Sequence, residues 1–370
     1  MDRGYLKLGG DEAMEYEKLP REYWEKHDYL LYVYDVLGDM LRKADKLKLS
    51  EFEIKFDSEE IGRDFEKTED MFEWMDRNNH HDTSLKMFKN HTFFSLLKDF
   101  CFFVYESLSC ASRGKVTVAY SLLRKPVRDN LLYLEWLLAD PEEFYQTFLF
   151  GSVEDCDVAN TKKFTWKRKK KIVQAACEKS YMGESLNSDN LVFNFRFDGK
   201  SDLGLQRIWN QSMHLVTTHS DNYKTEDGNL NFIFADEEIW GDFWNYYYTV
   251  LPQIMAYVLE ICEALFIETV DITDVELLFN RLLRFEKYAK LHPHIETMSE
   301  VEGKLVEVIE MLDKDSINLR MKCENCGKEI TIDNKVANEM ISSWFVACPN
   351  CQLEHNICKY FIDLGVAKMN

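Results

Sequence analysis

Four cysteines near the C-terminus have the spacing with the clearest chemical meaning in this sequence. Cys323 and Cys326 form one Cys-x-x-Cys pair, and Cys348 and Cys351 form a second pair further along the chain. Two thiolates separated by two residues can turn onto one metal ion, and two such pairs complete a four-sulfur site. We therefore predict one structural Zn²⁺ per chain, because four protein ligands leave no open position for substrate or reacting water.

The segments around these pairs, INLRMKC, CGKEITI and SWFVACP, are short and alternate in the manner of strands. The region resembles a zinc ribbon over roughly residues 316–360, and we assign residues 315–370 to this small module. His355 and Cys358 lie nearby and are expected to be bystanders. In the alternative interpretation, the four cysteines are a coincidence in an otherwise helical protein.

A second group of polar side chains lies upstream, on a predicted helix. In LQRIWNQSMHLVTTH, the residues Arg207, Asn210, Gln211 and His214 recur at the spacing that places side chains on one helix face. An Arg and a His on a shared face can hold a phosphodiester and transfer a proton. We therefore predict Arg207, His214 and Asn210 as candidate catalytic residues, although a solvated helix face would explain the same pattern.

This pattern resembles the HEPN superfamily of helical, metal-independent ribonucleases from toxins and phage-defence systems, whose signature is an Arg followed by a His on one helix. Arg207-x6-His214 fits the long end of that spacing, and Ile208 stands where the family prefers a polar residue. The resemblance covers about residues 85–265 through helix content and this motif. It implies attack of the RNA 2′-hydroxyl on the adjacent phosphate, usually across an interface between two chains, and hence a homodimer.

Two basic segments are candidate RNA contacts. The stretch TKKFTWKRKKK, residues 161–171, interleaves Lys and Arg with two aromatic rings, a combination that can hold phosphates and stack on bases. A helix further upstream contributes two arginines. The candidate RNA-binding residues are Arg124, Arg128, Lys167, Arg168, Lys169 and Lys170. In the alternative interpretation the run is a solvated or protein-docking surface, and Arg128 forms a structural ion pair.

Helical periodicity dominates the chain through residue 312, and Gly and Pro are sparse. Pro126 should kink the helix that contains it. The expected helices cover residues 21–49, 59–77, 84–108, 116–138, 202–218, 236–266, 275–291 and 297–312, with extended pieces at 191–197 and a strand at 229–234. We therefore predict a mainly α protein: a large helical domain over residues 1–314, with a HEPN-like helical bundle core, followed by the small β zinc ribbon.

Composition limits the function classes. The net charge of -20 argues against a protein that coats nucleic acid or anionic membrane with its whole surface, so any polyanion site must be local. The apolar stretch 246–266 is interrupted by Pro252, Glu260 and Glu263 and does not fit a membrane span. Ten cysteines without a visible leader favour a reducing compartment. We expect a cytoplasmic protein without membrane contact.

Two functions from different classes are compatible with these features. The first is a metal-independent RNA-cleaving effector of a prokaryotic defence or toxin-type system, in which Arg207 and His214 act on the RNA phosphodiester. The second is a noncatalytic helical scaffold whose zinc ribbon contacts a partner protein or nucleic acid. Aromatic-rich helices and an acidic surface are compatible with the second hypothesis.

Overall fold

The computed structural model describes residues 16, 18–218, 224–233, 236–270, 272, 274–292, 298–313, 319–357 and 365–366. Helices precede a small region of strands that carries the cysteines, which confirms the predicted mainly α fold class. The helices before the strands are η1 (Arg21–Tyr23), α2 (Trp24–Lys46), α3 (Glu59–Phe65), α4 (Met71–Arg77), α5 (His81–Ser112), α6 (Val116–Leu123), η2 (Arg124–Asn130), α7 (Leu131–Ala139), α8 (Pro141–Phe150), α9 (Val153–Cys156), α10 (Trp166–Glu178), α11 (Gly183–Leu186), η3 (Ser188–Asn190), α12 (Leu191–Phe197), α13 (Leu205–Met213), α14 (Glu237–Ile267), α15 (Asp274–Lys290) and α16 (Met298–Asp313).

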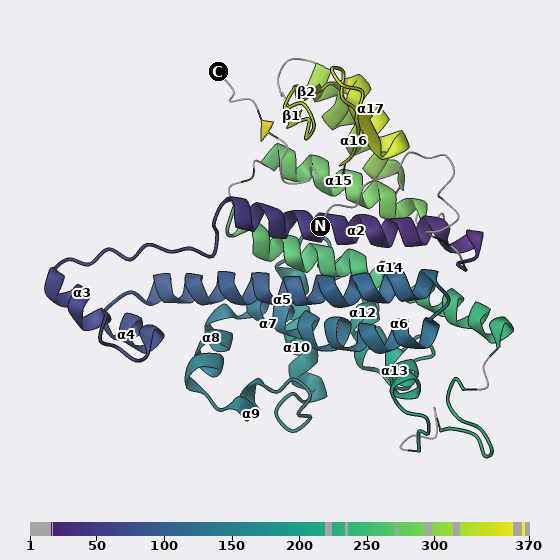
Figure 1. The fold of residues 1–370 in the computed structure, drawn as a ribbon, viewed down its shortest axis with the longest axis horizontal. Helices are drawn as coiled ribbons and strands as arrows, with labels where there is room; N and C mark the ends of the chain where they lie inside the picture. The colour runs from purple at the N-terminus through teal and green to yellow at the C-terminus, as the bar shows by residue number, and fades with distance from the viewer. Residues whose placement is uncertain are drawn as a thin grey trace.

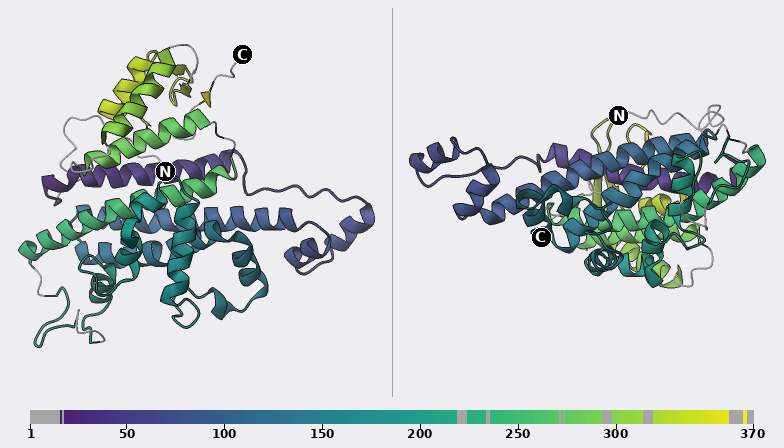
Figure 2. Two further views of the ribbon diagram at one scale, coloured as in Figure 1. Left: turned by 180° about the vertical axis from the view of Figure 1, so that it is seen from behind. Right: turned by 90° about the horizontal axis from the view of Figure 1, so that it is seen from below.

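The long helices α2, α5 and α14 pack along one another through the middle of the molecule (Figure 1). Helices α6 to α13 lie on one side of α5, and α15, α16 and the cysteine-bearing strands lie beyond α2 on the other side (Figures 1 and 2). Helix α14 is long and apolar enough to cross a membrane, but 89% of its apolar window is buried inside the protein. It therefore fits the description of a core helix.

Two predicted elements differ in the N-terminal half because local capping competes with periodicity. We expected one helix over residues 59–77, and the structure has α3 and α4 instead. The Asp70 side chain accepts a hydrogen bond from the backbone N–H of Glu73 at 3.0 Å and so begins a new helix. At Pro126, where we predicted a kink, the helix widens into the π-helical turn η2 between α6 and α7.

The segments near the predicted site differ more. Residues 191–197 form the helix α12 rather than extended pieces, because Val192, Phe195 and Arg196 are buried at helical spacing. Residues 231–233 form a turn rather than part of a strand, with Phe232 in the left-handed region at φ 64°. The helix expected to reach residue 218 ends at Met213.

Over its described residues, the cysteine-containing region combines five short strands with one helix. The strands are β1 (Leu319–Lys322), β2 (Glu329–Ile332), β3 (Phe345–Ala347), β4 (Glu354–Asn356) and β5 (Gly365–Val366), and they form the sheets β2-β1-β5 and β3-β4. All pairings are antiparallel, with Cys323 directly after β1 and Cys348 directly after β3. Helix α17 (Asn334–Ser343) joins the two halves. This helix, which Asp333 caps, was not among the predicted elements.

A second hydrophobic cluster connects this region to the helices before it. Buried side chains from α15 and α16, such as Phe279 and Val308, pack with Met321 of β1 and Met340 of α17. The main helical cluster contains Tyr288 from the same helix α15. Helix α15 therefore contributes to both clusters, and the domain boundary after residue 314 stays a prediction.

A fully buried ion pair lies inside the main cluster. Arg196 Nη1 of α12 donates to Glu135 Oε1 of α7 at 2.6 Å, and Tyr257 of α14 donates to the same oxygen at 2.8 Å. Arg196 Nε also donates to the carbonyl of Val127, in the π-helical turn, at 2.8 Å. One residue thus ties α12 to both α7 and η2.

Replacing Arg196 with Met is expected to lower the free energy of unfolding by about 3–5 kcal/mol, because it leaves the Glu135 carboxylate buried without a cation. Urea denaturation followed by circular dichroism measures this change. The double variant Arg196→Met with Glu135→Leu should recover much of the loss, since no uncompensated charge remains. An Arg196→Met variant as stable as the wild type would contradict the role given to this pair.

Candidate functional site

The first Cys-x-x-Cys pair lies on a tight turn between β1 and β2. The backbone N–H of Cys323 bonds the carbonyl of Lys328 at 2.9 Å, and the N–H of Gly327 bonds the carbonyl of Cys323 at 2.9 Å. Gly327 has φ 69°, a conformation that glycine adopts without steric cost. This turn brings Cys326 back beside Cys323.

The second pair repeats the same turn between β3 and β4. The N–H of Cys348 bonds the carbonyl of Leu353 at 2.9 Å, and the N–H of Gln352 bonds the carbonyl of Cys348 at 2.9 Å. Gln352 has φ 59° and takes the place that Gly327 has in the first turn. The two turns therefore present their cysteines in equivalent ways.

The four sulfur atoms gather around one point. All lie within 4.8 Å of one another, with 3.5 Å between the Sγ atoms of Cys323 and Cys351 and 3.7 Å between those of Cys326 and Cys348. These separations exceed the roughly 2.05 Å of a disulfide bond, and the four cysteines are free thiols. Four sulfur donors at this spacing can hold a metal ion.

Hydrogen bonds from the turns favour the thiolate form at two of the ligands. The side chain of Asn350 and the backbone N–H of Lys328 lower the pKa of Cys326 to about 6. A hydrogen bond from the backbone N–H of Leu353 lowers the pKa of Cys351, and a weaker side-chain hydrogen bond lowers it further. Burial raises the pKa of Cys323 to about 11. Cys326 and Cys351, the second cysteine of each pair, therefore supply the negative thiolate charge that a metal ligand needs.

His355 contacts this cluster, although we expected a bystander. Its side chain is buried, and its Nε2 lies 3.2 Å from the sulfur of Cys323. The pairing of His355 with Val346 across β3 and β4 places the ring there. A ring N–H that donates to a ligand sulfur orients and stabilises that ligand. Cys358 lies outside the described residues.

Replacing His355 with Ala is expected to weaken metal binding by roughly 10- to 100-fold, because Cys323 loses a hydrogen bond that supports it. The double variant Cys323→Ser with Cys348→Ser should lose the metal. Competition against a chromogenic chelator measures affinity, and elemental analysis measures content. The exposed His91 of α5 supplies a matched control, and equal affinities for His355→Ala and His91→Ala would contradict the contact's importance.

The predicted catalytic face is interrupted because α13 ends early. Arg207 and Asn210 lie on the helix, whereas His214 follows its last residue with extended backbone angles of φ -130° and ψ 133°. The expected i, i+7 alignment of Arg207 with His214 on one helix is therefore wrong. Both side chains are exposed, and neither has a hydrogen bond or an ion pair within the described part of the chain. The Asn210 amide donates to the carbonyl of Gln206 in its own helix.

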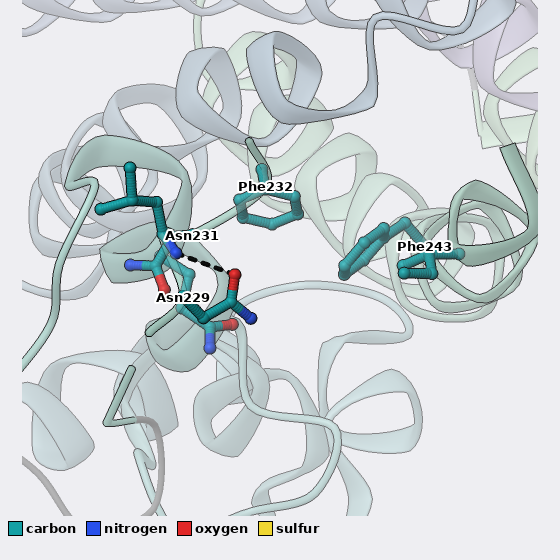
Figure 3. A pocket seen from close by; sticks show the side chains of 7 residues that line it. Asn229, Asn231, Phe232 and Phe243 are labelled. Carbon is teal, nitrogen blue, oxygen red and sulfur yellow. Dashed lines mark hydrogen bonds between the residues drawn. The ribbon is translucent and has the colours of Figure 1, made fainter. Parts of the chain in front are cut away.

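A hollow of about 190 Å³ lies beside α13 (Figure 3). Gln211, one turn after Arg207, lines it together with the loop after α13 and the start of α14. The loop residue Asn231 also lines it and donates to the carbonyl of His214 at 2.7 Å. The structure thus brings the Arg207 face, the His214 backbone and the loop of residues 229–232 together. The loop was not predicted as part of this site, because no spacing between its residues and those of α13 indicated that the two would meet.

Residues 166–171 of the basic run form the N-terminal half of α10, and their side chains divide into two sets. Arg168 pairs with Glu143 at 3.1 Å and covers the rings of Phe164 and Trp136. Lys169 is buried, with its Nζ 5.1 Å from the centre of the Phe197 ring. Burial lowers the pKa of Lys169 to about 8, and the charge of a nearby arginine contributes to this shift. The exposed side chains of this half of α10 are Trp166, Lys167, Lys170 and Lys171.

The two upstream arginines lie in the π-helical turn, and Arg128 lies near Lys169 of this helix. Arg128 is close enough to Lys169 for their charges to interact, and its Nε is buried without a hydrogen-bond partner among the described residues. Its nearest carboxylate, Asp129, is 4.0 Å away. Burial lowers the pKa of Arg128, and the charge of Arg124 lowers it further. The fold therefore gathers Arg124, Arg128 and Lys169 into a cationic cluster around the carboxylate of Asp129.

A scan of protein-family models, a search of curated proteins and a search of solved structures found no match to this chain. The resemblance to the HEPN superfamily therefore rests on the Arg207 and His214 motif and on helix content alone.

Proposed function

We propose that this protein binds single-stranded RNA through the exposed face of α10, with the cysteine module as a structural metal site. The observation that carries the proposal is the combination of Lys167, Lys170 and Lys171 with Trp166 on that face. Trp166 is half exposed and packs edge-on against Phe193 at 4.7 Å, which leaves ring surface open to solvent. Basic side chains beside an open aromatic ring can hold phosphates and stack on a base.

The charge distribution supports an anionic ligand at this place. The protein has a net charge of -20, yet the first turns of α10 contain no acidic residue. Cations near a helix N-terminus are disfavoured by the helix dipole, by about 0.3–1 kcal/mol each at exposed positions. The cationic cluster of Arg124, Arg128 and Lys169 lies behind the same helix. A phosphate backbone bound on α10 would offset the unfavourable interaction of these cations with the helix dipole and with one another.

We propose zinc as the metal of the cysteine module. A tetrahedral zinc site with metal–sulfur bonds of about 2.3 Å has sulfur–sulfur edges of about 3.8 Å. The separations of 3.5 Å between the sulfurs of Cys323 and Cys351 and of 3.7 Å between those of Cys326 and Cys348 are close to that value. Zinc bound there would hold β1, β3 and their turns together, because the second hydrophobic cluster is small. The elemental analysis that tests the ligands would then give about one zinc per chain.

Replacing Lys167 and Lys170 with Glu is expected to weaken binding of a single-stranded RNA oligonucleotide roughly tenfold or more at physiological salt. The variant should also show a shallower dependence of log Kd on log salt concentration, because fewer counterions are released. Fluorescence anisotropy at several salt concentrations measures both quantities.

The matched control replaces Lys86 and Lys98 of α5 with Glu, which changes the net charge equally at two exposed positions outside α10. If both double variants lose the same affinity, the RNA is attracted by overall charge and α10 is not its site. Failure of the wild-type chain to bind RNA would refute the proposal.

RNA cleavage by Arg207 and His214 is a second candidate function, in line with an RNA-cleaving effector of a defence or toxin-type system. One observation favours it. Both side chains are exposed beside the hollow that Gln211 lines, on the same side of α5 as α10 (Figures 1 and 2). RNA held on α10 would have a cation and an imidazole within the same region of the surface. Such a pair can transfer a proton at a phosphodiester.

If this second candidate is correct, the purified chain degrades RNA without added metal, and Arg207→Ala and His214→Ala each lower the rate by roughly 100-fold or more. Gel analysis of a labelled oligonucleotide measures the rate, and circular dichroism checks folding. His91→Ala and Arg63→Ala are matched controls at exposed positions. Equal rates in the wild type and in both Arg207 and His214 variants would eliminate these residues as catalytic.

A further inference from the structure

The hollow beside α13 combines aromatic rings with side-chain amides. Phe232 and Phe243 form an aromatic wall, with ring centroids 4.8 Å apart and planes inclined by 47°. Gln211 and Asn229 add amide groups, and Ile239 extends the apolar part of the lining. These side chains come from α13, the following loop and the first turns of α14 and gather around one space (Figure 3). Among the described residues, no charged side chain lines it.

The amides of the lining have different roles. Both ends of the Asn231 amide are engaged, since its nitrogen donates to the carbonyl of His214 and its oxygen accepts from Thr225 at 2.9 Å. The Asn229 oxygen accepts from the backbone N–H of Leu230, and its nitrogen has no partner in the described region. The side chain of Gln211 makes no hydrogen bond within that region. Asn231 therefore builds the loop, while Gln211 and Asn229 keep groups for a ligand.

The loop holds Phe232 in place at a conformational cost. Phe232 has φ 64°, a backbone region that a bulky side chain adopts only under strain. The loop is pinned by the backbone bond from Asn231 to the carbonyl of Leu215 at 2.8 Å and by the bond from Thr225 to the carbonyl of Thr217 at 2.8 Å. Backbone strain that the surrounding structure imposes is often found where a side chain is positioned for function.

We propose that this hollow binds a single unpaired nucleobase, which stacks on the Phe232 and Phe243 wall and hydrogen-bonds to Gln211 and Asn229. An amide side chain offers a donor and an acceptor side by side, the pattern that the edge of a base requires. A volume of about 190 Å³ is below the roughly 300 Å³ at which pockets for drug-sized ligands begin, so a single ring system fits better. The uncharged lining favours recognition of a base over recognition of a phosphate.

The inference deepens the proposed RNA binding and rests on it only for the source of the base. Helices α10 and α13 lie on the same side of α5 (Figures 1 and 2), so one RNA strand can reach both. The phosphates would contact α10, and one base would enter the hollow. An uncharged nucleoside, however, should occupy the hollow without any contribution from α10.

The experiment titrates adenosine, guanosine, cytidine and uridine separately into the full-length chain and measures binding by saturation-transfer NMR and calorimetry. At least one nucleoside is expected to bind, and Gln211→Ala and Phe232→Gly should each raise its Kd roughly tenfold or more. Phe232→Gly loses the packing of a partly buried ring but also relieves the positive φ, so its two effects on the melting temperature oppose each other. Circular dichroism must show a folded chain for the Kd of this variant to count, and Gln211→Ala tests the hollow without either effect.

Gln146→Ala on α8 is the matched control, because its amide is exposed and bonds Glu142 in its own helix. If no nucleoside binds, or if Gln211→Ala and Phe232→Gly bind as tightly as this control, the inference is overturned. The Lys167→Glu and Lys170→Glu variant separates the two proposals. It should lose RNA while it retains the nucleoside, whereas failure of the hollow alone would leave RNA binding to α10 intact.

Discussion

The buried pair of Glu135 and Arg196 is the polar contact around which the helical core is arranged. Two opposite charges removed from water require each other, because the desolvation cost of either one alone is several kcal/mol. Arg196 satisfies this requirement only if α12 lies against α7 and the π-helical turn. The carbonyl of Arg196 then accepts a hydrogen bond from Gln206 of α13. This hydrogen bond, together with the packing of α13 against α12 and α6, places α13 and the hollow beside it.

The cysteine module depends on the helices as much as on its metal ligands. Its strands are short, and its hydrophobic side chains complete a cluster with α15 and α16. A second link runs through Trp344, between α17 and β3, whose ring lies 3.8 Å from the buried ammonium group of Lys287. Tyr32 of α2 faces the same ammonium at 5.6 Å. Metal binding would therefore stabilise a region that is continuous with the helical body, rather than an isolated appendage.

Features set by neighbouring residues could be predicted from the sequence. The sulfur cluster is one, because two residues between cysteines limit each pair to a tight turn whatever the rest of the chain does. The interruption at Pro126 is another, since proline lacks the N–H that a regular helix requires. The mainly helical class follows from long-range periodicity, which describes burial on one face. In each case the physical cause lies within a few residues of the pattern.

Features that depend on distant partners were decided by the tertiary structure. The alternating residues 191–197 form a helix because Arg196 must reach Glu135, 61 positions earlier in the chain. The helix α13 ends at Met213, after which residues 214–217 bond to a loop that the sequence pattern assigned to a strand. The sequence alone thus determined the fold class and the cluster of four cysteines that could hold a metal ion. The surroundings of Arg207 and His214 were decided by packing, because hydrogen bonds and buried charges join segments whose separation no local pattern records.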